Sequence, residues 1–115
     1  CNPWMALTPS TDAAQTAMIQ CSVQHWAHAV TLSSVPAGTY EVYAYIWLDW
    51  ADPNAQAFDV LLEGQHVQDG VLVSAAGQWL KLGPWQVTIS DGALNLATEG
   101  GLPNLSGVEV WRVSG

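Results

Sequence analysis

Three aromatic residues alternate along one apolar segment at a spacing that suits sugar binding. Side chains of a β-strand point to opposite faces in turn, so Tyr43, Tyr45 and Trp47 share one face of an expected strand over residues 39–50. Sugar rings have apolar C–H faces that stack on aromatic rings, and alternate strand residues lie about 6–7 Å apart. The stripe therefore predicts a platform for a polysaccharide, on which Trp47→Ala would weaken binding by roughly 2 kcal/mol without unfolding the protein. The alternative is that this face packs under a loop or the second sheet, with Tyr40 exposed instead.

Polar and aromatic groups near the stripe extend the predicted platform. Asp49 shares its face, and Trp50 and Gln56 follow in the loop that leaves the strand. Glu109 and Trp111 alternate with valines near the C-terminus, and they join the platform if their strand lies beside residues 43–47. The predicted carbohydrate-binding residues are Tyr43, Tyr45, Trp47, Asp49, Trp50, Gln56, Glu109 and Trp111.

The loop after the stripe also carries hard oxygen ligands. Asp49, Asp52 and Asn54 could hold a structural calcium ion, although their spacing lacks the glycine and the terminal glutamate of an EF-hand. The alternative is an Asp-Pro-Asn turn whose side chains cap the backbone. His25 and His28 differ by three positions and so point to opposite faces of a strand, which opposes joint metal binding. We expect no required cofactor.

The charge balance disfavours anionic partners. The chain has ten acidic residues and only two basic ones, with a formal net charge of −8. Nucleic-acid binding needs several cations to neutralise phosphates, and anionic membranes or acidic polysaccharides such as pectate repel the same surface. No apolar run approaches the roughly 18 residues of a membrane span. We therefore expect a neutral polysaccharide as partner, and neither nucleic acid nor membrane.

Tryptophan and cysteine usage indicates a secreted module. Seven tryptophans are too many for the centre of so small a core, so some rings are expected at the surface, where exposed aromatic patches usually mark binding sites. Cys1 and Cys21 favour one disulfide in an oxidising compartment, with two free thiols in a cytosolic protein as the alternative. The chain begins without a basic segment followed by an apolar one, as a mature or excised module would.

Short apolar runs between closely spaced turns predict an all-β fold. Turn signals such as Asp69-Gly70 and Asp91-Gly92 recur along the chain, which is typical of a single-domain antiparallel sandwich or barrel over residues 1–115. One helical turn is expected within residues 10–17, capped by Ser10 or Thr11. The core face of the most informative strand is expected to carry Tyr40, Val42, Ala44, Ile46 and Leu48.

The order of several segments resembles the jelly-roll carbohydrate-binding modules of the malectin-like, galactose-binding-like type. The segments are Val35–Tyr43, Phe58–Gly64, Gly77–Trp79, Asp91–Leu96 and Pro103–Val110. The resemblance implies an antiparallel β-sandwich (jelly roll) that binds sugars beside a catalytic domain in a secreted enzyme. Family 81 of these modules, which binds β-glucans, is one candidate. The acidic residues that many such modules place early in the chain for a structural calcium ion are not evident in this sequence.

Catalysis is not expected from these residues. Glycoside hydrolysis needs two carboxylates about 5–10 Å apart, and Glu41 and Asp49 lie too far apart along one strand, although pairs such as Asp59 with Glu63 stay open. We expect noncatalytic binding of a β-linked glucan, cellulose or xyloglucan chain in an open groove, which targets a linked glycoside hydrolase to its substrate. The alternative is a protein-interaction or adhesion sandwich that uses the same aromatic patch.

Overall fold

The computed structural model describes residues 1, 3–24, 28–48, 57–73, 75–101 and 103–114. These residues form one short helix and eight strands. The elements are α1 (Ala13–Ile19), β1 (Val23–Gln24), β2 (Ala29–Leu32), β3 (Gly38–Trp47), β4 (Phe58–Leu62), β5 (Gln65–Val71), β6 (Trp79–Ile89), β7 (Leu94–Glu99) and β8 (Asn104–Ser114). No helix in the described part of the chain has the length and apolar character that crossing a membrane requires.

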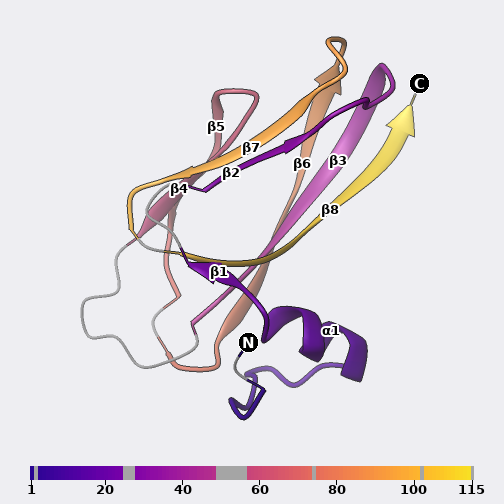
Figure 1. Ribbon diagram of the computed structural model, residues 1–115. Helices are drawn as coiled ribbons and strands as arrows, with labels where there is room; N and C mark the ends of the chain where they lie inside the picture. Colours follow the sequence, from indigo (N-terminus) through magenta and orange to yellow (C-terminus); the bar gives the residue numbers. More distant parts are fainter. Residues whose placement is uncertain (2, 25–27, 49–56, 74, 102, 115) are drawn as a thin grey trace.

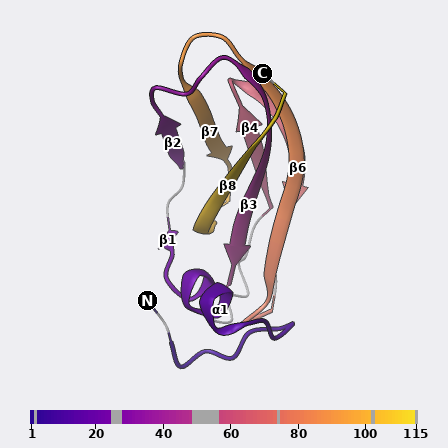
Figure 2. The ribbon, with the colours of Figure 1, turned by 90° about the vertical axis from the view of Figure 1, so that its right-hand side faces the viewer.

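The strands form two antiparallel four-stranded sheets. One has the order β1-β8-β3-β6 and the other β2-β7-β4-β5. The long strands β3, β6 and β8 lie side by side, and α1 sits at the end of the molecule opposite the C-terminus (Figures 1 and 2). The expected antiparallel β-sandwich is therefore confirmed.

The main core lies between the two sheets and follows the predicted alternation. Val42, Ala44 and Ile46 of β3 are buried against Phe58, Val60 and Leu62 of β4, within one apolar cluster. Tyr40 joins this core, and its hydroxyl donates a 2.6 Å hydrogen bond to the carbonyl of Pro36. The predicted core face of β3 is thus confirmed, and Leu48 packs against it as a partly buried residue.

A second apolar cluster lies on the outer face of the β3 sheet, beneath α1 and residues 3–12 (the N-terminal arm). Ile19, Tyr45 and Trp47 are each at most 1% exposed, and four partly buried side chains pack against them: Met5, Leu7, Met18 and Trp79. The indole of Trp79 stacks near the Tyr45 ring, with centroids 6.3 Å apart. The helix and the arm therefore cover one end of the sheet as a third layer (Figure 2).

The helix begins later than its sequence signals indicate. Asp12 is the N-cap, and its side chain accepts a 2.8 Å hydrogen bond from the backbone N–H of Gln15. The predicted caps, Ser10 and Thr11, lie in the arm instead. Starting at Ala13 places Ile19 of the last turn over the aromatic end of β3.

The predicted platform role of Tyr45 and Trp47 is wrong, because protein already covers both rings. Each is about as buried as the aliphatic core, and the indole N–H of Trp47 donates a 3.0 Å hydrogen bond to Ser22 Oγ. The alternative stated above holds in part: this face packs under another segment at this end of β3, but Tyr40 is buried in the main core and not exposed. A polysaccharide cannot stack on these two rings without displacing the arm.

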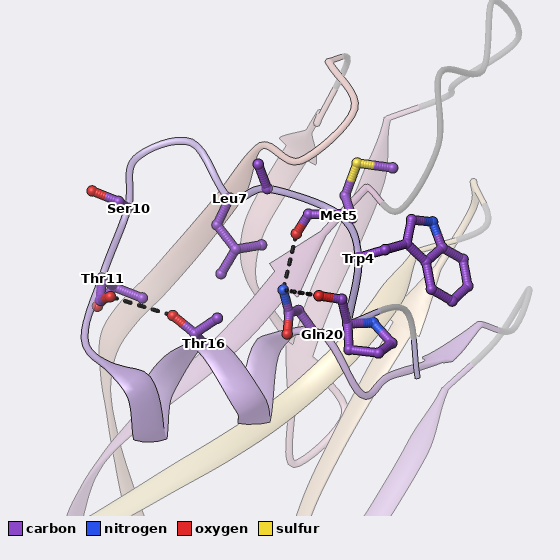
Figure 3. Close-up of a pocket in the computed structure, with 9 residues that line it drawn as sticks. Trp4, Met5, Leu7, Ser10, Thr11, Thr16 and Gln20 are labelled. Atoms are coloured by element: carbon purple, nitrogen blue, oxygen red, sulfur yellow. Dashed lines mark hydrogen bonds between the residues drawn. The ribbon is translucent and has the colours of Figure 1, made fainter.

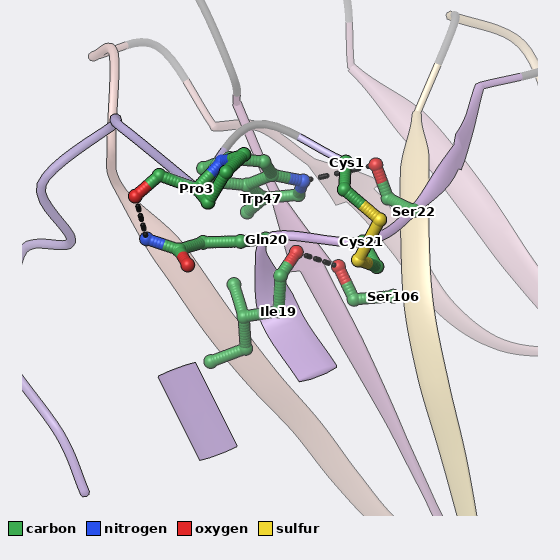
Figure 4. Close-up of a disulfide and its surroundings, with 8 residues drawn as sticks. All are labelled: Cys1, Pro3, Ile19, Gln20, Cys21, Ser22, Trp47 and Ser106. Atoms are coloured by element: carbon green, nitrogen blue, oxygen red, sulfur yellow. Dashed lines mark hydrogen bonds between the residues drawn. A yellow bond between two sulfur atoms is a disulfide. The ribbon is translucent and has the colours of Figure 1, made fainter. Parts of the chain in front are cut away.

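The predicted disulfide is confirmed between Cys1 and Cys21, and it fastens the arm across this cluster. Figure 4 shows it close to Trp47 and to the hydrogen bond from Ser106 Oγ to the carbonyl of Ile19, which is 2.7 Å long. Farther along the arm, the N–H of Thr8 donates to the carbonyl of Gly77 at 2.9 Å, and Trp79 Nε1 donates to the carbonyl of Pro9 at 2.7 Å. Both ends of the arm are therefore attached to the sandwich.

Removing the buried tryptophan tests this second cluster. We expect Trp47→Ala to lower the free energy of unfolding by about 3–5 kcal/mol, because the loss of the ring leaves a cavity under the arm. Urea denaturation followed by circular dichroism measures the change. Trp111→Ala is the matched control, since its ring is 60% exposed and should change the value by less than about 0.5 kcal/mol. Similar losses in the two variants would contradict the burial of Trp47.

Removing the disulfide tests how far the arm depends on it. We expect Cys1→Ser with Cys21→Ser to lower the free energy of unfolding by about 3 kcal/mol, because the bond closes a loop between residues 20 positions apart and restricts the unfolded chain. Near-ultraviolet circular dichroism should also lose intensity as Tyr45, Trp47 and Trp79 are released. A reductant should reproduce this effect in the original protein and have none in the double variant.

Candidate functional site

The part of the outer face that the arm leaves uncovered carries a group of aromatic and charged side chains. Register places them together: Tyr43 of β3 lies opposite Glu109 of β8, and Glu41 lies opposite Trp111. On the other side of β3, Gln86 lies opposite Glu41, and Lys81 lies opposite Tyr45. Directly opposed residues in antiparallel strands share a face. We call this surface the open half, formed by Glu41, Tyr43, Lys81, Gln86, Glu109 and Trp111.

Trp111 is the exposed aromatic ring of the open half. Its side chain is 60% exposed, yet its indole N–H donates a 3.0 Å hydrogen bond to Glu109 Oε2. The hydrogen bond satisfies the one polar group of the indole and restrains the orientation of the ring. What the ring still offers to a partner is its apolar face.

Glu109 connects the exposed ring to the buried cluster. Its Oε1 accepts a hydrogen bond from the hydroxyl of Tyr45, which in turn accepts one from Gln15 Nε2 of α1 at 3.2 Å. The hydrogen bonds from Tyr45 and Trp111 lower the pKa of Glu109, while burial and the bond to Glu109 raise the pKa of the Tyr45 phenol. Glu109 is therefore an anion at neutral pH, with both oxygens engaged by neighbouring side chains.

Lys81 completes the open half and was not anticipated from the sequence. Its Nζ lies 4.3 Å from the centroid of the Tyr43 ring and 3.9 Å from Glu109 Oε1. The cation therefore rests on one face of a partly buried tyrosine while retaining donors for a partner. The one sequence signal that could have drawn attention to Lys81 is the rarity of cations, since the chain contains only two basic residues.

The predicted site residues separate into three groups. Tyr43, Glu109 and Trp111 are brought together on neighbouring strands, as the predicted platform required. Tyr45 and Trp47 lie under the arm, where Tyr45 contributes only its hydroxyl to the open half. The remaining predicted ligands, Asp49, Trp50 and Gln56 for sugar with Asp52 and Asn54 for calcium, lie outside the described residues.

A separate pocket lies between the arm and α1. It has a volume of about 290 Å³, and Thr11, Thr16 and Gln20 line it together with the exposed ring of Trp4 (Figure 3). Gln20 Nε2 donates to the carbonyls of Met5 and Pro3, so its amide holds the arm in its bend. The side chain of Trp4 is 76% exposed.

Groups close enough to share a metal ion occur on the other sheet. Among the described residues, these are Asp59, His66 and Asp69, all outside the open half.

Comparisons with known proteins detect the fold but no sequence family. No protein-family model matches the chain, and no curated protein matches it significantly. Among solved structures, it is similar to a β-glucuronidase from Bacteroides uniformis, with a TM-score of 0.72 and 14% identity over 90% of this chain. The chain spans only 12% of that enzyme's length.

Two carbohydrate-binding modules are also similar in structure. A family 35 module from an environmental isolate has a TM-score of 0.54 and 18% identity, covering 76% of this chain and 66% of the module. A family 35 module from Clostridium thermocellum has a TM-score of 0.51 and 13% identity, covering 76% and 70%. At these identities the similarity shows the fold, and the chain is a jelly-roll β-sandwich of the kind that such modules have.

Proposed function

We propose that this chain is a noncatalytic carbohydrate-binding module whose ligand stacks on Trp111 in the open half. The observation that carries the proposal is an indole that is exposed and yet held by a hydrogen bond. An exposed tryptophan with a restrained orientation loses little conformational freedom on binding. The structural similarity to family 35 carbohydrate-binding modules supports the same class of function.

The chemistry of the open half suits a sugar. Trp111 offers an apolar face for the C–H groups of a pyranose ring, and Tyr43 lies on the adjacent strand. Lys81, Glu41 and Gln86 surround these rings with donors and acceptors for hydroxyl groups. Stacking then supplies most of the affinity, and the polar groups set the orientation of the chain.

The charge of the chain favours a neutral ligand. The formal net charge is −8, and within the open half the two carboxylates of Glu41 and Glu109 outnumber the single cation of Lys81. A polyanion would be repelled, whereas a glucan would not. We therefore propose a β-linked glucan, cellulose or xyloglucan as ligand, and assignment to family 81 stays a prediction. In this proposal the module is secreted and directs a linked glycoside hydrolase to its substrate.

The ionisation of Glu109 opposes one catalytic role, that of a glycosidase acid. A glycosidase acid needs a carboxyl whose pKa is raised so that it can donate a proton. The pKa of Glu109 is lowered, and its oxygens accept hydrogen bonds from Tyr45 and Trp111. This carboxylate is arranged to position an aromatic ring.

Replacing the exposed ring tests the proposal. We expect Trp111→Ala to weaken binding of a soluble β-glucan by about 2 kcal/mol or more, because the stacking surface is lost while the fold is kept. Affinity electrophoresis against mixed-linkage β-glucan, xyloglucan, hydroxyethyl cellulose, mannan and pectate selects the ligand, and isothermal titration calorimetry measures its affinity. Trp4→Ala, which removes the other strongly exposed tryptophan among the described residues, is the matched control and should bind normally.

Other outcomes of the binding experiments would place the site elsewhere or favour the adhesion alternative. Loss of binding in Trp4→Ala but not in Trp111→Ala would move the site to the pocket of the arm. Failure of every glycan to bind, together with self-association that soluble glucan does not alter in size-exclusion chromatography, would favour the adhesion alternative. Exposed Trp111 and Val113 on β8 would then form the contact.

The pH dependence of binding tests the role of Glu109. The ionised Glu109 carboxylate holds the indole of Trp111. Because the pKa of Glu109 is below the ordinary value of 4.5, this hydrogen bond to the anion is present above pH 4.5 and is lost as the pH falls through the lowered pKa. We expect calorimetric affinity to stay constant from about pH 7 to about pH 5 and to fall only below 4.5. Glu109→Gln cannot titrate and should remove the dependence. A midpoint near neutral pH would assign the effect to another group.

A further inference from the structure

A compact group of metal-ligating side chains lies on the outer face of the sheet opposite the open half. Asp59 projects outward from β4, between the buried residues Phe58 and Val60. His66 and Asp69 come from β5, and Glu99 of β7 lies directly opposite Asp59. Three neighbouring strands therefore supply four ionisable side chains to one place.

Irregular pairing between β4 and β5 brings these side chains together. Leu61 pairs with His66 and Val60 with Gln68, so β5 has one extra residue there, and the register shifts again before Phe58 pairs with Val71. In a regular strand, residues three apart point to opposite faces. The bulges instead let both His66 and Asp69 lie near Asp59.

The distances within the group suit one shared ion. His66 Nδ1 is hydrogen-bonded to Asp69 Oδ1 at 2.7 Å and lies 3.8 Å from Asp59 Oδ2. A metal that binds Nδ1 takes the place of the proton in this bond, which is released to solvent. One ligand atom from each of the three residues lies within 4.8 Å of the other two. Ligands about 2.0–2.1 Å from a tetrahedral metal lie roughly 3.3 Å apart, so the present spacings need only small side-chain rotations. All three side chains are partly exposed, so little packing opposes these rotations.

A second layer of contacts orients the ligands. The N–H of Gly70 donates a 3.0 Å hydrogen bond to Asp59 Oδ1, which leaves Oδ2 directed toward His66. On the other side of the imidazole, His66 Nε2 lies 3.6 Å from Glu99 Oε2. This distance is just beyond hydrogen-bond range, and a small rotation of Glu99 would close it. A carboxylate that accepts a hydrogen bond from the non-ligating nitrogen fixes the tautomer and raises the basicity of a metal-bound histidine.

We propose that Asp59, His66 and Asp69 form a binding site for a divalent transition metal of the zinc class. His66 supplies Nδ1, each aspartate supplies one oxygen, and water completes the coordination. Glu99 acts as the carboxylate partner of Nε2. An imidazole nitrogen with two carboxylate oxygens favours Zn²⁺ over Ca²⁺, which prefers six to eight oxygens. The ion would link β4 to β5, on the face away from Trp111.

Calorimetric titration of the full chain with ZnCl₂, without any histidine tag, tests the site. We expect one Zn²⁺ per chain, with at least a ten-fold loss of affinity in His66→Gln and in Asp69→Asn. Glu99→Gln should weaken binding by about ten-fold, because it removes only the partner of Nε2. Asp91→Asn is the matched control, since this exposed carboxylate accepts a hydrogen bond from Ala93 in a distant turn.

Two further measurements make the result decisive. Nitrogen-15 NMR of the imidazoles should show Zn²⁺ shifting Nδ1 of His66, and circular dichroism should show that each variant is folded. Absence of zinc binding would overturn the proposal, as would binding that His66→Gln leaves unchanged or an affinity for Ca²⁺ above that for Zn²⁺. Trp111→Ala should bind Zn²⁺ normally, so failure of the sugar proposal would not affect this result.

Discussion

The burial of Tyr45 and Trp47 beneath the N-terminal arm is the contact on which the rest of the outer face depends. Without the arm, two large rings of β3 would face solvent at one end of the sheet. With it, the Tyr45 ring packs below Trp79 and its hydroxyl meets Glu109. The same carboxylate holds the indole of Trp111. The orientation of an exposed ring thus depends, through Tyr45 and Glu109, on the helix and the disulfide that hold the arm in place.

The alternation of aliphatic with aromatic and charged residues along β3 was sufficient to predict the sandwich and its core. Aliphatic residues at every second position can face only a dry interior, and Val42, Ala44 and Ile46 do so. The other face was ambiguous, because an aromatic stripe satisfies two environments equally well: a sugar platform and a second protein layer. Deciding between them requires knowing where residues 3–19 dock, and that depends on packing between segments far apart in the chain.

Strand register explains why the remaining parts of both sites were not predicted. Lys81 lies opposite Tyr45 through a pairing that shifts between Val42 and Ala44, so its position could not be counted from the turns. His66 and Asp69 share a site only because β5 is bulged against β4. A period of two assigns residues to faces within a regular strand, but it fails wherever one strand has an extra residue. Glu109 and Trp111 were placed correctly because no shift separates them.

The double use of Glu109 has a thermodynamic consequence. One carboxylate accepts hydrogen bonds from a residue of the buried cluster and from the exposed indole, so the docking of the arm and the alignment of Trp111 are linked equilibria. Such linkage is reciprocal: a ligand that binds only the aligned indole must also favour the docked arm, by the same free energy. Occupancy at one end of the sheet would then slow reduction of the Cys1–Cys21 bond at the other.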